Sequence, residues 1–360
     1  MILSALAPVA GGPRLGRTLA RTAAVVAVLA GLIGLHAAAQ PPREPPQLMI
    51  DVLTDQAIDA ALRFLAERQH EDGSVGSGSY RQNVAVTSLA GLAWMSGGNT
   101  PGRGKYGANV DRAVDFVLEK AGPSGYLVVP TSTSHGPMYD HGFGALFLAE
   151  AYGMTHRADL HEKLQKAVRL IVDTQNNEGG WRYQPVRRDA DISVTICQIM
   201  ALRAARNAGI FVPKSTVDRC IDYVKRSQNP DGGFRYMIHS GSSAFPRSAA
   251  GIVALYSAGL YEGPEIQRGL DYLMQHLPDG RDQRRVESHY FYGHYYAVQA
   301  AWQAGGSYWQ RWYPAIRNEL LQLQQKDGSW TIDSICVEYG TAMAAIILQM
   351  PNNYLPIFQR

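Results

Sequence analysis

The sequence predicts an all-α fold, a closed (α/α)6 toroid in which two concentric rings of helices are built from six helix hairpins. Three observations support this prediction: an internal repeat of about fifty residues, two helical patterns within each repeat, and almost no alternating pattern of the kind that strands show. The chain has 360 residues, of which 46% are hydrophobic, so it can bury a large core.

A glutamine–glycine string marks the repeat. In four copies the glycine follows the glutamine by four residues, and three of these copies carry an aromatic residue two positions later. Two weaker copies contain the glycine without the glutamine. The six glycines are Gly73, Gly125, Gly179, Gly232, Gly280 and Gly328, which follow one another at intervals of 48 to 54 residues.

Two helices are predicted in each repeat, one on each side of this glycine. In the third repeat, the helix before the glycine has one apolar stripe, which predicts an outer helix; the stripe consists of Leu160, Leu164, Ala167, Val168, Ile171 and Val172. The segments after the glycine are apolar all round, which is typical of buried inner helices; examples are 192–208, 249–260 and 340–350. Because the last repeat is as apolar as the middle ones, we expect a closed ring and not an open solenoid with polar end repeats.

The first 39 residues have the pattern of a secretory signal peptide. Three arginines precede an apolar run at 23–35, and alanines at 37–39 supply the small residues before a predicted cut at Gln40. The run has 13 residues, whereas a membrane-spanning helix needs about 20. An uncleaved anchor is the alternative. The pattern predicts an extracytoplasmic protein, periplasmic or secreted, with no integral membrane segment after cleavage.

The remaining boundaries follow from composition. The predicted segments are a signal peptide at 1–39, a proline-rich linker at 40–53, the toroid at 54–350 and a C-terminal tail at 351–360. The net charge of +3 comes from the three arginines of the signal segment, so the predicted mature chain is balanced. Without a basic stripe, we expect no nucleic-acid partner. The three cysteines are too few and too far apart for a disulfide framework.

The string Q-x-x-x-G-x-W at the end of an amphipathic helix resembles the QW motif of squalene and oxidosqualene cyclases. It also resembles the related repeat of protein prenyltransferase β subunits, so the sequence is identified as a member of the prenyltransferase/squalene oxidase repeat proteins of the terpenoid cyclase superfamily. The resemblance spans 54–350 and implies the same α/α toroid. It also implies a structural role, tying neighbouring helices together, for Gln175, Trp181, Gln324 and Trp330.

Candidate binding residues lie where the inner helices begin, because the loops that enter these helices form the mouth of the central cavity in a toroid. These positions are rich in tyrosine and in titratable groups. The predicted ligand-binding residues are Tyr80, Tyr139, Asp140, His141, Tyr183, Arg188, Tyr236, Arg247, Glu287, His289, Tyr292 and Glu338. Tyrosines can stabilise carbocations through their faces, and they also suit a polar ligand.

The string Asp189-Ala-Asp191-Ile192 is similar to the DxDD motif of class II terpene cyclases, whose middle aspartate protonates an alkene or epoxide. The resemblance implies that Asp191 is a catalytic acid and Asp189 its neighbour, with His141 and His289 close by. Ile192 stands where the motif has its last aspartate. Two alternatives remain open: Asp191 caps the helix that follows it, or it binds a ligand.

No cofactor or metal is predicted. His289, Asp333 and Cys336 are the ligand types by which prenyltransferase β subunits hold zinc, but the spacing of that site is absent, and ordinary buried or hydrogen-bonded roles are preferred.

The leading hypothesis is an exported toroid that binds or transforms an isoprenoid-like or other elongated hydrophobic ligand, with class II cyclase-like acid catalysis if it is an enzyme. Transferase chemistry is less favoured. The alternatives are a non-catalytic toroid that binds a peptide or glycan, and a carbohydrate-active (α/α)6 enzyme with paired carboxylates.

Overall fold

The computed structural model describes residues 49–132, 136–155, 157–278, 289–332 and 335–359, which belong to one compact unit, Glu44–Arg360. The predicted signal peptide and most of the linker lie outside these residues. Twelve helices, α2 to α13, order the described residues, and the extended segments between them form isolated bridges only. None of these helices combines the length and the apolar character needed to cross a membrane.

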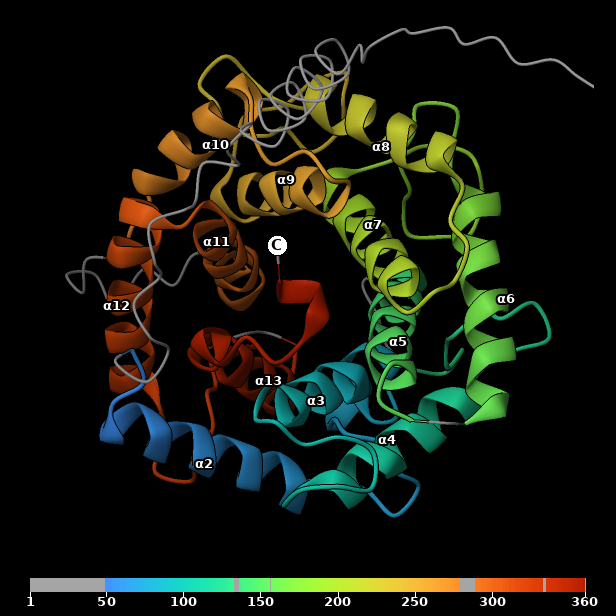
Figure 1. The fold of residues 1–360 in the computed structure, drawn as a ribbon, viewed down its shortest axis with the longest axis vertical. Coiled ribbons are helices and arrows are strands. Elements are labelled where there is room, and N and C mark those ends of the chain that lie inside the picture. Colours follow the sequence, from blue (N-terminus) through green and yellow to red (C-terminus); the bar gives the residue numbers. More distant parts are fainter. Residues whose placement is uncertain (1–48, 133–135, 156, 279–288, 333–334, 360) are drawn as a thin grey trace, which may run out of the picture. The chain divides into compact units, whose positions relative to one another are not determined.

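The helices alternate between two rings (Figure 1). The outer ring consists of α2 (Val52–Glu67), α4 (Gly107–Glu119), α6 (Ala158–Thr174), α8 (Lys214–Arg226), α10 (Pro264–Met274) and α12 (Gly306–Leu323). The inner ring consists of α3 (Val84–Ser96), α5 (Pro137–Tyr152), α7 (Ile192–Asn207), α9 (Phe245–Ser257), α11 (Tyr290–Ala304) and α13 (Val337–Leu348). This arrangement confirms the predicted all-α toroid of six hairpins.

The ring is closed. Each inner helix packs against the next one, and the last inner helix, α13, packs against the first, α3. In the outer ring α12 packs against α2. Gln324, at the end of α12, donates from Nε2 to the backbone oxygen of Ala57 in α2 at 2.9 Å. The first and last hairpins are therefore joined through the same kind of contact as neighbours along the chain.

The glutamine of the repeat bridges successive outer helices. In each of the four copies its Nε2 donates to the glycine oxygen four residues later and to a backbone oxygen near the start of the next outer helix. In the third repeat, Gln175 reaches the oxygens of Gly179 and Thr216 at 2.8 and 2.9 Å. Trp181 then donates back to the oxygen of Ile171 in α6 at 2.7 Å. These bonds satisfy backbone groups at helix ends that would otherwise lack partners.

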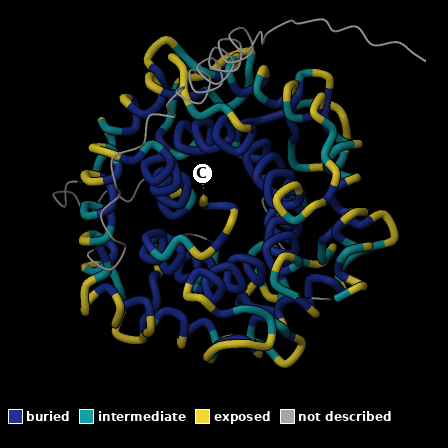
Figure 2. Tube along the Cα trace, viewed as in Figure 1, coloured by how far each residue is buried: buried dark blue, intermediate teal, exposed yellow. Residues whose placement is uncertain are grey.

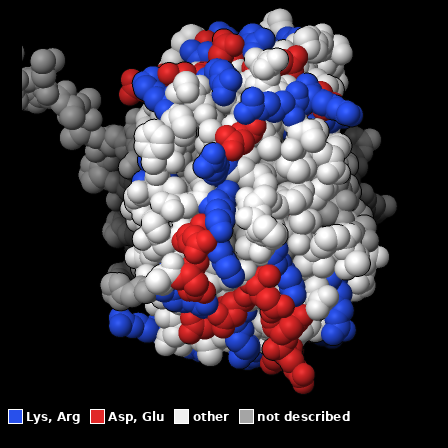
Figure 3. All heavy atoms as spheres, turned by 90° about the vertical axis from the view of Figure 1, so that its right-hand side faces the viewer, with Lys and Arg blue, Asp and Glu red and all other residues white. Residues whose placement is uncertain are grey.

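Burial follows the hydrophobic pattern. The inner helices are buried along most of their length, whereas the outer helices are buried only on the side that faces the inner ring (Figure 2). In α6 the predicted stripe is buried except for Val172, which is half-buried. On the outer surface, basic and acidic side chains lie side by side, as Figure 3 shows for one face.

Two predicted inner-helix starts lie too far along the chain, by three residues for α13, which begins at Val337 and not at Gly340, and by four residues for α9. The sequence pattern places the start of the fourth inner helix at Ala249, but α9 begins at Phe245 and contains Pro246 in its first turn. Proline is tolerated there, because its missing N–H would have no partner within the helix.

The end of the chain covers the inner ring at the side where the inner helices end (Figure 1). Short 3-10 turns at Met350–Asn352 and Pro356–Phe358 bury Leu355, Ile357 and Phe358. This segment bonds to four inner helices: the Asn352 side chain donates to the backbone oxygen of Ser96 in α3, and backbone groups of the segment bond to the side chains of Glu150 in α5, Arg203 in α7 and Gln303 in α11. The toroid is therefore closed at one end, and a ligand would have to enter at the other.

Candidate functional site

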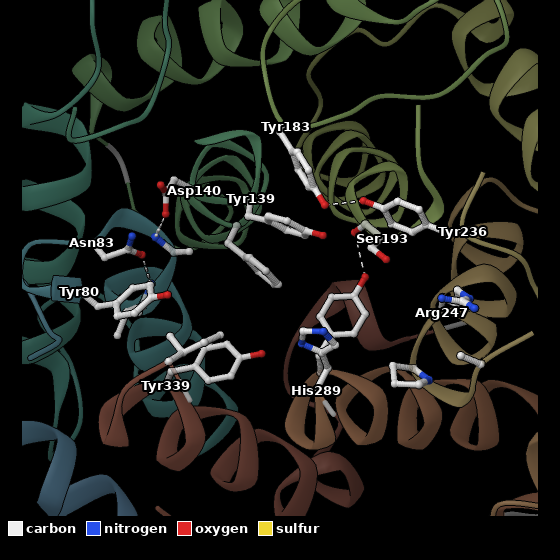
Figure 4. Close-up of a pocket in the computed structure, with 17 residues that line it drawn as sticks. Tyr80, Asn83, Tyr139, Asp140, Tyr183, Ser193, Tyr236, Arg247, His289 and Tyr339 are labelled. Carbon is white, nitrogen blue, oxygen red and sulfur yellow. Dashed lines mark hydrogen bonds between the residues drawn. The ribbon is translucent and has the colours of Figure 1, made fainter. Parts of the chain in front are cut away.

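A cavity of about 440 Å³ opens where the inner helices begin. Its lining comes from the starts of all six inner helices or from the loops that lead into them (Figure 4). Six of the lining residues are tyrosines: Tyr80, Tyr139, Tyr183, Tyr236, Tyr292 and Tyr339. Ala85, Val86, Phe143, Ala244, Pro246 and Ile335 add apolar surface, and Asn83, Asp140, Ser193, Arg247 and His289 add polar groups. Size and composition both fit a small-molecule site.

Eight of the predicted ligand-binding residues line this cavity. They are Tyr80, Tyr139, Asp140, Tyr183, Tyr236, Arg247, His289 and Tyr292. They meet because each inner helix presents its first turn to the same end of the ring, so the repeat period brings distant positions together. His289, which precedes α11, has a left-handed backbone with a φ of 63°. Such a conformation is uncommon for a residue with a side chain, although histidine adopts it more readily than most.

The floor of the cavity is aromatic. Phe143 of α5 lies edge-on to Tyr295 of α11, with 6.3 Å between the ring centroids. Tyr295 in turn lies 6.5 Å from Phe358, in the segment that covers the far end of the ring. These rings separate the cavity from the C-terminal segment.

Asp191 lies just behind the cavity wall. Its Oδ1 accepts the backbone N–H of Val194 at 2.9 Å, so it caps α7, as one of the two alternatives from the sequence expects. Its Oδ2 accepts the hydroxyl of Tyr236 at 3.2 Å. The Asp191 side chain is fully buried, and its hydrogen bond with Tyr236 joins it to a residue that lines the cavity.

A chain of hydroxyl groups joins Asp191 to the cavity. The Tyr236 hydroxyl also bonds to the hydroxyl of Tyr183, and both rings line the cavity (Figure 4). Arg182 lies over the faces of both tyrosine rings, at 5.2 and 5.8 Å from their centroids, and its Nε is 3.7 Å from Asp191 Oδ2. This arginine also pairs with Asp189. The network therefore holds one buried carboxyl group, one cation and two phenols in fixed order.

Burial raises the pKa of Asp191 to about 6, against the opposing effects of the Val194 N–H, the Tyr236 hydroxyl and Arg182. A protonated fraction therefore persists close to neutral pH. Burial also raises the pKa of Tyr139, Tyr236 and Tyr292 above the ordinary value for tyrosine, so all three phenols are neutral and can donate. A carboxylic acid beside neutral phenols is an arrangement that can deliver a proton.

Some predicted residues lie outside the cavity lining. Asp189 is half-buried and pairs with Arg182, and Arg188 is exposed on the same loop. Glu338, in the first turn of α13, is buried and accepts the Ser77 hydroxyl at 2.8 Å. Glu287 lies outside the described residues.

His141 faces away from the cavity although it stands in the first turns of α5. Its Nδ1 accepts the backbone N–H of Leu127 at 3.2 Å, and its Nε2 lies 3.1 Å from the backbone oxygen of Ala167. Burial lowers the pKa of His141 to about 4. A neutral imidazole with both nitrogens bonded to the main chain holds an outer helix in place and does not support Asp191 directly.

The described residues do not assemble a metal site. No group of three or more histidine, cysteine, aspartate or glutamate side chains is placed to share an ion within them. Of the zinc set weighed from the sequence, His289 and Cys336 are described, and Asp333 lies outside. Burial raises the pKa of Cys336 to about 12, so its thiol stays protonated.

The sequence also left several lining residues out of the predicted set, chiefly Asn83, Phe143, Ser193 and Tyr339. Two of them carry a recognisable signal. Asn83 caps α3 by accepting the Val86 N–H. Because all inner helices begin at the end of the ring where the cavity opens, a residue that caps one of them lies at the mouth. Phe143 follows Tyr139 by four residues and so shares its helix face.

Comparison with known proteins places the chain in a family. The prenyltransferase alpha-alpha toroid domain matches residues 11–180 and 141–277, more than half of the chain. The chain belongs to this family. It is also 28% identical to the drimenyl diphosphate synthase of Streptomyces showdoensis over 126 residues. That match covers 35% of this chain and 23% of the synthase, so the chain spans about a quarter of that relative.

Solved structures share the toroid fold at low sequence identity. A variant of the type II terpene cyclase MstE from Scytonema, in complex with the substrate geranylgeranyl dihydroxybenzoate, superposes with a TM-score of 0.58 at 15% identity. The match covers 84% of this chain and 98% of the cyclase. An inactive α-1,6-mannanase of Salegentibacter in complex with α-1,6-mannotriose gives a TM-score of 0.60 at 9% identity, covering 83% and 98%. At these identities the fold is shared, and activity is a separate question.

Proposed function

We propose that this toroid binds an isoprenoid-like, elongated hydrophobic ligand in its cavity and protonates it, in the manner of a class II terpene cyclase. The observation that carries this proposal is the link between a buried, protonatable carboxyl group, Asp191, and an aromatic-lined cavity, through the hydroxyl of Tyr236. The similarity to a drimenyl diphosphate synthase and to a type II terpene cyclase supports the same reaction class.

The proton would pass from Asp191 through Tyr236, once Asp191 is protonated and the hydrogen bond that Tyr236 donates to it has reversed. Protonated Asp191 donates to the oxygen of Tyr236, while Tyr236 releases its own hydroxyl proton towards the cavity, where it adds to a carbon of the ligand's double bond. The electron pair of that bond forms the new C–H bond, and a carbocation is left. Asp191 becomes a carboxylate, Tyr236 is neutral again, and the proton that the cyclised cation later loses restores the balance.

The cavity wall suits such a cation. Aromatic faces stabilise positive charge, and the lining tyrosines come from the starts of α5, α11 and α13 and from the segments before α3, α7 and α9. The apolar lining, including Phe143, which packs against Tyr295, offers water no hydrogen-bond partner. Exclusion of water protects a reactive intermediate from early quenching.

The test compares binding and turnover in the same preparations. The purified chain is incubated with farnesyl diphosphate, geranylgeranyl diphosphate or squalene at pH 5.5 and 7.5; products are separated by gas chromatography with mass spectrometry, and bound ligand is counted by native mass spectrometry. We expect cyclised product, with more at pH 5.5, because the protonated fraction of Asp191 falls as the pH passes 6. Asp191→Asn and Tyr236→Phe should keep binding and lose turnover about 100-fold or more.

Asp51→Asn is the matched control. Asp51 caps the outer helix α2 with the same geometry, its Oδ1 accepting the N–H three residues later at 2.8 Å, but it lies far from the cavity lining. Full turnover in Asp191→Asn would overturn the acid role, and failure of every isoprenoid to bind would overturn the proposal as a whole.

A carbohydrate ligand is the second candidate, favoured by the similarity to a mannanase that binds mannotriose. Glycoside hydrolysis uses a pair of carboxyl groups beside the sugar. Among the described lining residues, Asp140 supplies the one carboxylate. Adding α-1,6-mannotriose to the ligand panel distinguishes the two candidates, since binding of mannotriose is expected only if the natural ligand is a carbohydrate.

A further inference from the structure

The cavity has a charged side and an apolar side. Ala244, Pro246 and Arg247, at the start of α9, form one wall, and Arg247 brings a guanidinium group to it. On the other side, Ala85 and Val86 of α3 and Phe143 of α5 form apolar surface. Asp140 lies on that side too, across the cavity from Arg247 (Figure 4).

Arg247 has no carboxylate partner among the described residues. Its Nε donates to the backbone oxygen of Phe234 at 3.1 Å and its Nη2 to that of Ser242 at 2.6 Å, whereas Nη1 makes no hydrogen bond to a described residue. Burial lowers the pKa of Arg247, and no acid contributes to the opposing effects. A cation that is half removed from water without a counterion is costly, and a bound anion would offset this cost.

The backbone around Arg247 adds to this preference. Arg247 stands in the first turn of α9, where the helix dipole places partial positive charge. On the far side, the Asp140 carboxylate accepts the N–H of Ala85 at 3.3 Å and makes that region unfavourable for a second anion. The cavity is therefore electropositive at the Arg247 side and electronegative at the Asp140 side.

We propose that Arg247 anchors an oxyanion, a carboxylate or phosphoryl group, at the head of an amphiphilic ligand whose apolar chain extends towards Ala85, Val86 and Phe143. This inference rests on the proposed function for the isoprenoid-like character of the chain, and it adds the chemistry and the direction of the head group. A guanidinium group suits either oxyanion, because its planar donors match two oxygens at once.

The experiment varies only the head group. Farnesol, farnesoic acid and farnesyl diphosphate share one chain, and their dissociation constants are measured by isothermal titration calorimetry. For the wild type we expect both anionic ligands to bind about 10- to 100-fold more tightly than farnesol, the range of one or two charge-assisted hydrogen bonds. The tighter of the two anions identifies the head group as a carboxylate or a diphosphate.

Arg247→Gln should abolish this preference and leave the affinity for farnesol within about twofold, while Arg247→Lys should keep part of it. Arg235→Gln is the matched control, because Arg235 also donates to two backbone oxygens in the same repeat but does not line the cavity. If Arg247→Gln fails to fold, the salt dependence of the wild type gives the same information, since salt should weaken the anionic ligands and spare farnesol.

Equal affinity of the wild type for all three ligands, or an equal loss for all three in Arg247→Gln, would overturn the anchor while leaving an isoprenoid site intact. Binding of none of the three to the folded wild type would overturn the proposed function instead, so the two failures are distinguishable.

Discussion

At the scale of single residues, two aspartates that both cap a helix have pKa values shifted in opposite directions. Asp51 and Asp191 both cap a helix through Oδ1. Hydrogen bonds from Thr54 lower the pKa of the exposed Asp51, whereas burial raises the pKa of Asp191 to about 6. The same sequence signal, an aspartate before a helix, therefore gives a surface cap in one place and a buried acid in the other.

This difference predicts a pH effect on stability. Because the pKa of Asp191 is higher in the folded than in the unfolded chain, folding binds a proton between these two values, and stability falls as the pH rises through them. Between pH 4.5 and 7.5 we expect Asp191 to account for a loss of about 2 kcal/mol in the free energy of unfolding, which Asp191→Asn removes.

Urea denaturation at the two pH values measures this loss. Asp51→Asn is again the control: a lowered pKa gives stability that is lost only as the pH falls below the ordinary aspartate range, so this variant should show the same loss between pH 4.5 and 7.5 as the wild type. An identical pH dependence in the wild type and Asp191→Asn would show that Asp191 is ionised when buried.

Sequence reasoning found Asp191 but not its surroundings. An aspartate before an apolar run is a local pattern, whereas the hydroxyl that reaches Asp191 comes from Tyr236, 45 residues further along the chain. His141 shows the reverse case. Its position at the start of an inner helix is local and was predicted, but its bonds to Leu127 and Ala167 turn its ring away from the cavity, and only the packing of the hairpin determines that.

At the scale of elements, the structure gives a steric reason for the repeat glycines among the described residues, which the sequence shows only as a regular spacing. Gly179 has a φ of +101°, and a Cβ built on it would lie 2.1 Å from the backbone oxygen of Arg219 in α8. Gly73, Gly232 and Gly328 meet the next outer helix in the same way. The glycine thus lies in the turn beyond the end of the outer helix, where the lack of a side chain allows the next outer helix to approach.

Gly179→Ala and Gly209→Ala separate these two effects. Gly209 also has a positive φ, +85°, but a Cβ there would meet no atom within 4 Å. We expect Gly209→Ala to cost about 1 kcal/mol of stability, from backbone strain alone. Gly179→Ala should cost at least about 3 kcal/mol, because α8 must also move. Chemical denaturation measures both, and equal costs would mean that the contact with α8 relaxes freely.

The C-terminal segment is the element that the sequence described least well. Residues 351–360 are proline-rich and lack a helical period, so a tail was the natural interpretation. In the structure, Leu355, Ile357 and Phe358 are buried, and the segment bonds to four inner helices that are distant in sequence. Hydrophobic residues without a period carry no local signal of where they pack, so only the assembled ring gives this segment a place.

At the scale of the whole molecule, closure of the ring decides how stability is distributed. In an open solenoid each end repeat has one neighbour, so its helices open before the middle ones. Here the first and last hairpins meet through α3 and α13 and through α2 and α12, and Gln324 bonds across the junction to Ala57. Every hairpin therefore has two neighbours, although the junction joins elements from opposite ends of the chain.

Hydrogen exchange should show this directly. We expect the backbone amides of the inner helices α3 and α13 to be as well protected as those of α7, at the middle of the chain, because all three have inner-ring neighbours on both sides. Gln324→Ala should raise exchange selectively in α2 and α12, whereas the equivalent change Gln175→Ala should raise it in α6 and α8, whose junction Gln175 bridges. Faster exchange of α3 and α13 in the wild type would show instead that the ring opens at the junction between the first and last hairpins, which no peptide bond joins. The cavity would then open as well, because residues from both hairpins line it.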